Sequence, residues 1–258
     1  MIFLILLGAL TSLSLPPFNY IIINFLTFSL FFIFLIKKIE LYKNKKLFFF
    51  YGWLFGFGYF VSNLYWISIS LTFDENFKFL IPFAIILIPA FLSLFYGFAL
   101  VIFKLVFNSK SIFANILIFS LTLSYFEYLR GNILSGFPWN LIAYSFFKNL
   151  NFLQINSLIG IYAFNMILIT IFSTPAILFV KRKKKDLFGI VLVIVLSLSI
   201  YIYGILNIKN FNNKELQDLP INLNVLSTNI PIERYYSNFD DEKVLIDLIN
   251  LSNPNPQE

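Results

Sequence analysis

Two side chains capable of ionic chemistry stand at the end of an apolar segment near the middle of the chain. Glu127 and Arg130 are three residues apart, a spacing that places both on one face of a helix. An ionisable side chain in or beside a membrane span is costly and is therefore usually paired. We expect a Glu127–Arg130 pair, with two roles left open. It either orients its helix or contacts a lipid headgroup or substrate.

The segment that follows this pair contains a turn and several aromatic residues. Gly136, Phe137, Pro138 and Trp139 are consecutive, and the turn would place the indole near a membrane interface, where tryptophan is enriched. Interfacial anchoring is the ordinary role of such a residue, and substrate contact is the alternative. The candidate lipid-facing or substrate-facing residues are therefore Glu127, Arg130, Gly136, Phe137, Pro138, Trp139 and Tyr144.

Several kinds of chemistry are excluded by composition, because the chain contains no cysteine and no histidine. Disulfides, thiolate nucleophiles, imidazole general bases and the usual zinc sites all require one of these residues. We assign no catalytic residue and expect neither a metal nor a cofactor.

The composition is that of an integral membrane protein. Hydrophobic residues make up 59% of the 258 residues and charged residues only 12%, whereas a soluble domain usually carries about a quarter charged residues. A span requires roughly 20 predominantly apolar residues. The sequence predicts seven spans, at residues 1–15, 20–36, 47–71, 79–107, 111–128, 152–180 and 187–206.

The first predicted span is short and could also be a signal peptide. No basic region precedes it, and a second apolar segment follows directly after Pro16 and Pro17, so a membrane hairpin is favoured. In the third span, Gly52 and Gly56 form a small-xxx-small pair, a pattern typical of close helix packing.

The distribution of cations predicts the orientation. Twelve lysines and arginines lie in or beside the connections after spans two, four and six, whereas the opposite connections hold three. The positive-inside rule then places the amino terminus in the cytoplasm and everything after residue 206 on the outer face. The net charge of +6 is explained by these topology signals, so we expect no nucleic-acid partner.

The composition changes after the last span. Residues 207–258 hold 8 of the 13 acidic residues. Residues 221–225 alternate between apolar and polar, which predicts a strand, and the acidic run 240–242 opens an apolar segment, which predicts a helix. One strand and one helix cannot form a core. We therefore expect residues 1–206 to form a transmembrane domain and residues 207–258 to begin an incomplete α/β domain.

Four segments in order along nearly the whole chain resemble the apolipoprotein N-acyltransferase family. The first is the L-P-P-F turn, and the second is a G-F-G-x-F pattern followed by a tryptophan. The third is E-x-L-R-G followed by G-F-P-W and a Tyr-Ser pair, and the fourth is an N-I-P strand opening. The residues are Leu15–Phe18, Gly56–Phe60 with Trp66, Glu127–Gly131 with Gly136–Trp139 and Tyr144, and Asn229–Pro231.

The resemblance implies a bacterial inner-membrane enzyme with eight spans and an extracytoplasmic nitrilase-like domain. In this family a Glu-Lys-Cys triad takes an acyl chain from a phospholipid, typically phosphatidylethanolamine, as a thioester. It then transfers the chain to the amino group of the lipid-modified cysteine of an apolipoprotein. The expected fold is thus an all-α polytopic membrane bundle followed by the first strand and helix of an incomplete nitrilase-like domain.

This chain departs from the family pattern at the catalytic triad. It has no cysteine, and Glu258 follows Gln257, whereas the family's glutamate directly follows a proline after an apolar strand. We therefore expect no catalytic residue and no activity from the chain alone. The alternatives are a small membrane transporter or lipid-handling protein without covalent chemistry, and a gene fragment with no function of its own.

Overall fold

The computed structural model describes residues 1–42, 44–108, 110–134, 136–180, 183–213, 225–227 and 241–252. Within these ranges the regular structure is entirely helical, and no strand occurs. The α-helices are α1 (Ile2–Ser12), α2 (Ile22–Leu41), α3 (Lys45–Leu64), α4 (Ile81–Val106), α5 (Ile112–Asn132), α6 (Leu150–Leu153), α7 (Asn156–Ser173), α8 (Lys184–Asn212) and α9 (Asp241–Ser252). Four 3-10 segments accompany them: η1 (Tyr65–Thr72), η2 (Glu75–Leu80), η3 (Ile142–Phe146) and η4 (Thr174–Leu178).

Six helical segments in the described part of the chain are long and apolar enough to cross a membrane. They correspond to the second to seventh predicted spans, so the chain is a multi-pass membrane protein. The first predicted span is wrong in length: α1 has 11 residues, about 17 Å of helix against a hydrocarbon core of about 30 Å. The hydroxyls of Thr11 and Ser12 bond to carbonyls of the same helix, and α1 ends there.

Helix α1 lies against α3 with almost no side chain between the two backbones. A Cβ atom at Gly8 would lie 2.0 Å from the carbonyl oxygen of Phe55, and one at Gly58 would lie 2.0 Å from the carbonyl oxygen of Ile5. Helices approach this closely only where one partner lacks a side chain. The short helix is therefore held by tight packing on α3.

The sixth predicted span, residues 152–180, is divided in the structure. The short helix α6 is followed by α7 and η4, and α7 itself is interrupted at Gly160, whose φ is 76°. Glycine adopts this conformation without steric cost. The spanning part begins at Asn156 and ends at Leu178.

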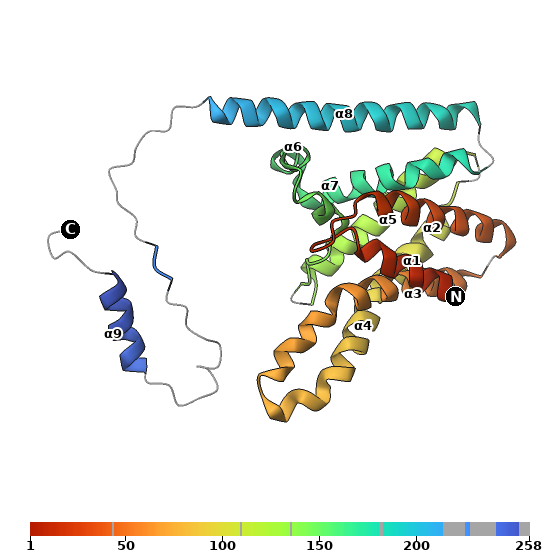
Figure 1. The fold of residues 1–258 in the computed structure, drawn as a ribbon. Coiled ribbons are helices and arrows are strands. Elements are labelled where there is room, and N and C mark those ends of the chain that lie inside the picture. Colours follow the sequence, from red (N-terminus) through yellow and green to blue (C-terminus); the bar gives the residue numbers. More distant parts are fainter. Residues whose placement is uncertain are drawn as a thin grey trace.

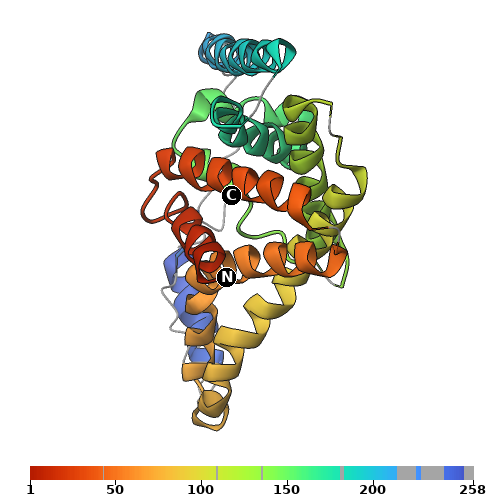
Figure 2. The same cartoon turned by 90° about the vertical axis from the view of Figure 1, so that its right-hand side faces the viewer.

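The helices pack around an aromatic core, with α8 at the outer edge. Phe31 of α2 stacks on Phe55 of α3 with ring centroids 4.1 Å apart, and Phe119 of α5 meets Phe31 edge-on at 5.8 Å. The α3–α4 hairpin projects from the bundle and carries η1 and η2 at its tip (Figure 1). Both views place α8 outside the remaining helices, along α7 (Figures 1 and 2).

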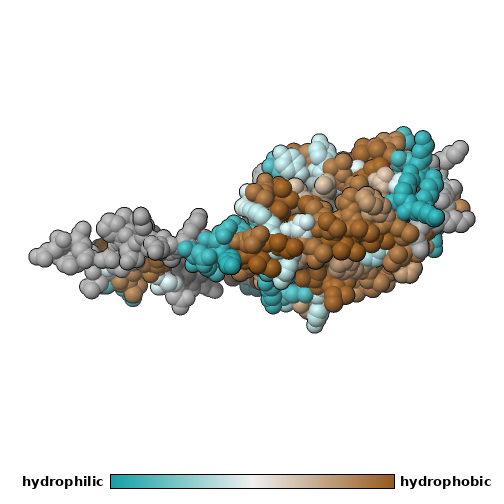
Figure 3. Space-filling view, turned by 90° about the horizontal axis from the view of Figure 1, so that it is seen from above, coloured by the Kyte–Doolittle hydropathy of each residue, from teal (hydrophilic) through white to brown (hydrophobic). Residues whose placement is uncertain are grey.

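Hydrophobic and hydrophilic residues are distributed over the surface as expected for a membrane protein. On the face that carries α8, hydrophobic residues cover the middle and hydrophilic residues gather at the two ends (Figure 3). The connections after α2 and after α7 lie at one end of the bundle, at the right in Figure 1, and α8 ends at the opposite side. At the first end, Lys104 donates a hydrogen bond to the carbonyl oxygen of Ile39 at 3.2 Å.

The close packing predicted for Gly52 and Gly56 is confirmed. A Cβ atom at Gly52 would lie 2.2 Å from the carbonyl oxygen of Tyr96 on α4, and one at Gly56 would lie 3.1 Å from the Cβ of the same tyrosine. The two glycines thus let α3 approach the turn of α4 from which Tyr96 projects.

We expect Gly52→Ala to lower the free energy of unfolding by about 1–3 kcal/mol, the usual cost of overpacking, because a helix backbone carbonyl cannot move aside alone. Gly56→Ala is the matched control. A Cβ atom there would lie 3.1 Å from the Tyr96 side chain and 3.3 Å from Cα of Ser93, so its neighbours need to move by only a few tenths of an ångström. The higher helix propensity of alanine, about 1 kcal/mol, offsets this crowding. Thermal unfolding in detergent micelles measures both variants, and equal losses at the two positions would contradict this packing.

After the last span, the predicted helix is confirmed as α9, and α8 runs to Asn212, six residues beyond the predicted end at 206. The predicted strand 221–225 lies outside the described residues except for Val225, which has no regular structure. The N-I-P segment, Asn229–Pro231, and Glu258 also lie outside the described residues.

Candidate functional site: a loop held by buried polar side chains

The carboxyl group of Glu127 is buried where α4, α5 and α7 meet. Glu127 is 1% exposed. Its Oε1 accepts a hydrogen bond from the Tyr96 hydroxyl at 2.6 Å, and its Oε2 accepts one from Nδ2 of Asn165. Asn165 Nδ2 also lies 3.3 Å from Oγ of Ser124. A polar group taken out of water must be hydrogen-bonded to be tolerated, and here α4 and α7 supply the partners of Glu127.

Arg130 is buried to the same extent, 1% exposed, one turn further along α5. Its Nη1 donates to the carbonyl oxygen of Trp139 at 2.8 Å. Its guanidinium carbon lies 5.1 Å from the ring centroid of Phe60 and 5.8 Å from that of Phe137, distances at which a cation is attracted to an aromatic face. Arg130 therefore joins the end of α5 to the loop and to α3.

The direct Glu127–Arg130 pair predicted from the spacing is wrong. Glu127 and Arg130 do not approach within the 4 Å of an ion pair, as Lys78 and Glu75 do. The two side chains do share α5 and burial, but each turns to a different set of neighbours: Glu127 to α4 and α7, and Arg130 to the loop. Helical spacing shows which residues can meet but not which partners on other segments compete for them.

The loop folds back onto the end of α5 through Gly136. This residue has φ of 77°, and a Cβ atom on it would lie 2.5 Å from the carbonyl oxygen of Gly131. The next residue, Phe137, donates its backbone N–H to the carbonyl oxygen of Arg130 at 2.8 Å. Position 136 therefore requires glycine both for its backbone conformation and for space.

Beyond the turn, the loop enters the protein interior. Leu141, Ile142 and Ala143 are at most 1% exposed. The Tyr59 hydroxyl donates to the carbonyl oxygen of Asn140 at 2.9 Å, and the backbone N–H of Ala143 donates to Oδ1 of Asn165 at 3.0 Å. Asn165 thus uses one end of its amide for Glu127 and the other for the loop.

On the outer side of the loop, aromatic rings form an exposed group. Trp139 is 49% exposed and Trp66 is 45% exposed, with ring centroids 5.4 Å apart. Phe137 lies 5.3 Å from Trp139. The Tyr144 hydroxyl donates to the carbonyl oxygen of Pro138 at 3.2 Å, and burial raises the pKa of this phenol, so it remains a donor. Such amphipathic rings suit a membrane interface.

The structure brings all seven predicted site residues into one region, but three side chains on other helices that bond to the loop or to Glu127 were not among them. These are Tyr59, Tyr96 and Asn165. The available signal was a hydroxyl or amide inside an otherwise apolar span, which needs an internal partner. The arrangement can position a loop and present aromatic rings, but none of these residues is a thiolate or an imidazole.

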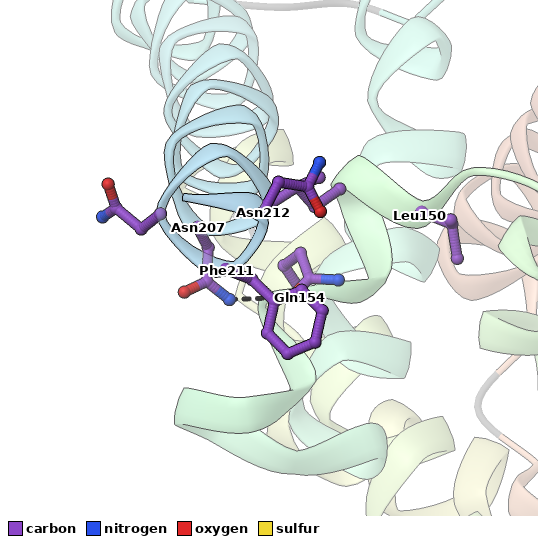
Figure 4. Close-up of a pocket in the computed structure, with 7 residues that line it drawn as sticks. Leu150, Gln154, Asn207, Phe211 and Asn212 are labelled. Atoms are coloured by element: carbon purple, nitrogen blue, oxygen red, sulfur yellow. Dashed lines mark hydrogen bonds between the residues drawn. The ribbon is translucent and has the colours of Figure 1, made fainter. Parts of the chain in front are cut away.

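A separate cavity of about 490 Å³ lies where α6 meets the end of α8 (Figure 4). Its polar lining consists of neutral amides, and Asn207 donates to Gln154 across it at 2.7 Å. Neutral amides at this position join the two helices and offer no acid or base. The described residues contain no cluster of acidic side chains able to hold a metal ion.

Comparison with known proteins assigns the family. The sequence pattern that defines the apolipoprotein N-acyltransferase N-terminal domain matches residues 7–174, which include α5, the loop and α7. The chain belongs to the apolipoprotein N-acyltransferase family. The resemblance seen in its sequence motifs is thereby confirmed.

Individual apolipoprotein N-acyltransferases align with different parts of the chain. The one from Rhodopseudomonas palustris is 38% identical over 177 residues, 67% of this chain and 32% of that protein. The one from Brucella melitensis is 29% identical over 257 residues, 97% of this chain and 48% of that protein. The one from Rhizobium rhizogenes is 31% identical over 207 residues, which are 78% of this chain and 38% of that protein. The chain thus spans between a third and a half of the length of these relatives.

Proposed function

We propose that this chain forms the membrane part of an enzyme that transfers an acyl chain from a phospholipid to the amino-terminal diacylglyceryl-cysteine of apolipoproteins. The observation that carries the proposal is the match over residues 7–174. This range covers four of the six candidate spans completely and most of a fifth, and it includes the loop fixed by Glu127, Arg130 and Asn165. In this proposal residues 1–206 are the transmembrane domain, and residues 207–258 open the nitrilase-like domain.

In this proposal the membrane part positions the donor phospholipid and the apolipoprotein, and it makes or breaks no bond itself. Acyl transfer through a thioester requires a thiolate nucleophile, a general base and a group that stabilises the tetrahedral oxyanion. With no cysteine in the chain, the nucleophile must come from outside these 258 residues. The exposed rings of Trp139 and Trp66 are suited to the interface, where the donor phospholipid, typically phosphatidylethanolamine, and the apolipoprotein meet the enzyme.

The proposed location is the bacterial inner membrane, with the amino terminus in the cytoplasm and the loop and tail outside. Two observations support this orientation. Twelve cations lie in or beside alternate connections, and Lys104 and Lys184 lie at the end of the bundle where α2 ends and α8 begins (Figure 1). Reporter enzymes fused at position 183 and after Asn210 test it. Opposite compartments are expected, and a cytoplasmic tail would contradict it.

Rescue of cells depleted of their own apolipoprotein N-acyltransferase tests the function. The 258-residue chain alone is expected not to restore growth, because it lacks the nucleophile. A chimera in which it replaces the aligned half of the Brucella melitensis relative is expected to restore growth. The same chimera with its catalytic cysteine changed to serine is the control. Rescue by the chain alone, or failure of a chimera that accumulates normally, would overturn the proposal.

A further inference from the structure

Helix α8 is fastened to the bundle at its first turns. Oδ1 of Asp186 accepts hydrogen bonds from Oγ of Ser111 at 2.7 Å and from the backbone N–H of Phe113 at 3.1 Å. One turn on, a Cβ atom at Gly189 would lie 2.3 Å from the ring of Phe113. The start of α8 is therefore in close contact with the start of α5.

The other end of α8 is fastened just as closely to α6. A Cβ atom at Gly204 would lie 1.8 Å from the carbonyl oxygen of Asn151, so the two backbones are in contact there. Asn207 donates to Oε1 of Gln154 at 2.7 Å, the bond drawn in Figure 4. The contacts at the two ends fix the distance of α8 from its neighbours. The middle of the helix lies between these two points of contact.

Between the two fastened ends, α8 stands off from α7 and leaves an apolar groove of about 380 Å³. The groove is lined from α2, α7, η4 and α8, and its apolar walls include Phe25, Ile171, Pro175, Leu178, Ile194 and Leu198. Ile194 and Leu198 are 54% and 56% exposed. The gap is therefore open from the side that faces the bilayer.

The two hydroxyls in the groove wall are already bonded within their own helices. Thr174 donates to the carbonyl oxygen of Thr170 at 2.7 Å, and Ser197 donates to that of Val193 at 2.8 Å. The wall therefore offers apolar contact and no free donor. A headgroup or a peptide backbone placed there would lose its hydrogen bonds to water without replacement.

The volume of the groove distinguishes between the two remaining possible occupants, a helix and an acyl chain. A helix about 10 Å across occupies on the order of 850 Å³ over two turns, which is more than twice the volume present. A single acyl chain is narrow, flexible and wholly apolar, and it fits a space within the usual range of ligand pockets, about 300–1,000 Å³. We propose that this groove holds one acyl chain of a bilayer phospholipid, independently of any acyl-transfer reaction.

The test uses the whole chain in nanodiscs of phosphatidylethanolamine and phosphatidylglycerol, followed by exchange into detergent and native mass spectrometry. The wild type is expected to retain a phospholipid through this exchange. Ile194→Trp should reduce retention about tenfold, because displacing even two methylene groups of a buried chain has that effect on affinity. Ile202→Trp is the matched control, since Ile202 is also on α8 and also 54% exposed but does not line the groove.

Leu198→Trp and its control Leu206→Trp, at 56% and 54% exposure, repeat the comparison should the first variant fail to accumulate. The wild type can also be labelled with a phosphatidylethanolamine that carries a photoreactive group in mid-chain. Adducts are then expected on both walls, at Ile171 or Pro175 and at Ile194 or Leu198, and less at Ile202. The proposal is overturned by loss of all phospholipid from the wild type, by equal retention in groove and control variants, or by labelling confined to α8.

Discussion

Glu127→Ala is expected to prevent accumulation of the folded chain in the membrane. The substitution removes the acceptor of two buried donors, the Tyr96 hydroxyl and Nδ2 of Asn165. It also removes the electrostatic attraction between the carboxyl group and Arg130, which acts although the two side chains form no direct ion pair. Each buried donor left without an acceptor costs about 1–3 kcal/mol, and two donors are affected. Since a domain is stable by only about 5–15 kcal/mol, a large part of the stability would be lost.

Membrane abundance and thermal unfolding in detergent measure this effect. Glu127→Gln should be milder, because its amide keeps one acceptor oxygen for Tyr96 or Asn165. Glu75→Ala should change neither quantity, since Glu75 belongs to a surface ion pair and its side chain is 84% exposed. Normal abundance and an unchanged unfolding temperature for Glu127→Ala would show that the buried contacts do not support the fold.

Trp139→Ala is expected to lower acyl transfer about tenfold or more in a chimera that carries the missing domain, while the protein still accumulates. The indole is half exposed, so its loss leaves no large cavity. Its backbone carbonyl, which accepts the bond from Arg130, is retained in alanine, so the loop stays attached to α5. What is lost is the aromatic surface shared with Trp66 and Phe137, and small errors in positioning can reduce rates by about a hundredfold.

The measurement is acyl transfer per folded molecule. Phe188→Ala is the control, because Phe188 is 67% exposed on α8, away from the loop, and should leave the rate unchanged. A normal rate in Trp139→Ala would reduce these rings to membrane anchors. If the abundance of the protein falls and the rate per folded molecule stays normal, the indole contributes to folding instead.

Six of the seven predicted spans were found because hydropathy over roughly 20 residues is a property of the segment itself. The first span was predicted too long, since an apolar segment of 15 residues looks the same whether it crosses the bilayer or packs against α3. The contact of Gly8 and Gly58 with the neighbouring backbones holds this short helix against α3. That contact depends on which helices become neighbours, and the sequence pattern carries no such information.

Only part of the candidate site was predicted, because the sequence pattern does not show which helices become neighbours. The motif residues from Glu127 to Tyr144 lie close together in sequence, and the structure places them at the end of α5 and in the loop that follows it. Asn165 is 38 residues from Glu127, and its two bonds connect α7 to α5 and to Ala143. The predicted Glu127–Arg130 pair failed because two residues that share a helical face can still find better partners on other segments.

The most direct test of the central claim is mass spectrometry of an apolipoprotein substrate incubated with the purified chimera and phosphatidylethanolamine. With the chimera, the acceptor is expected to gain the mass of one acyl chain on its amino-terminal cysteine. With the 258-residue chain alone, which has no cysteine, it is expected to gain none. An acyl chain transferred by the isolated chain, or none transferred by a well-folded chimera, would contradict it.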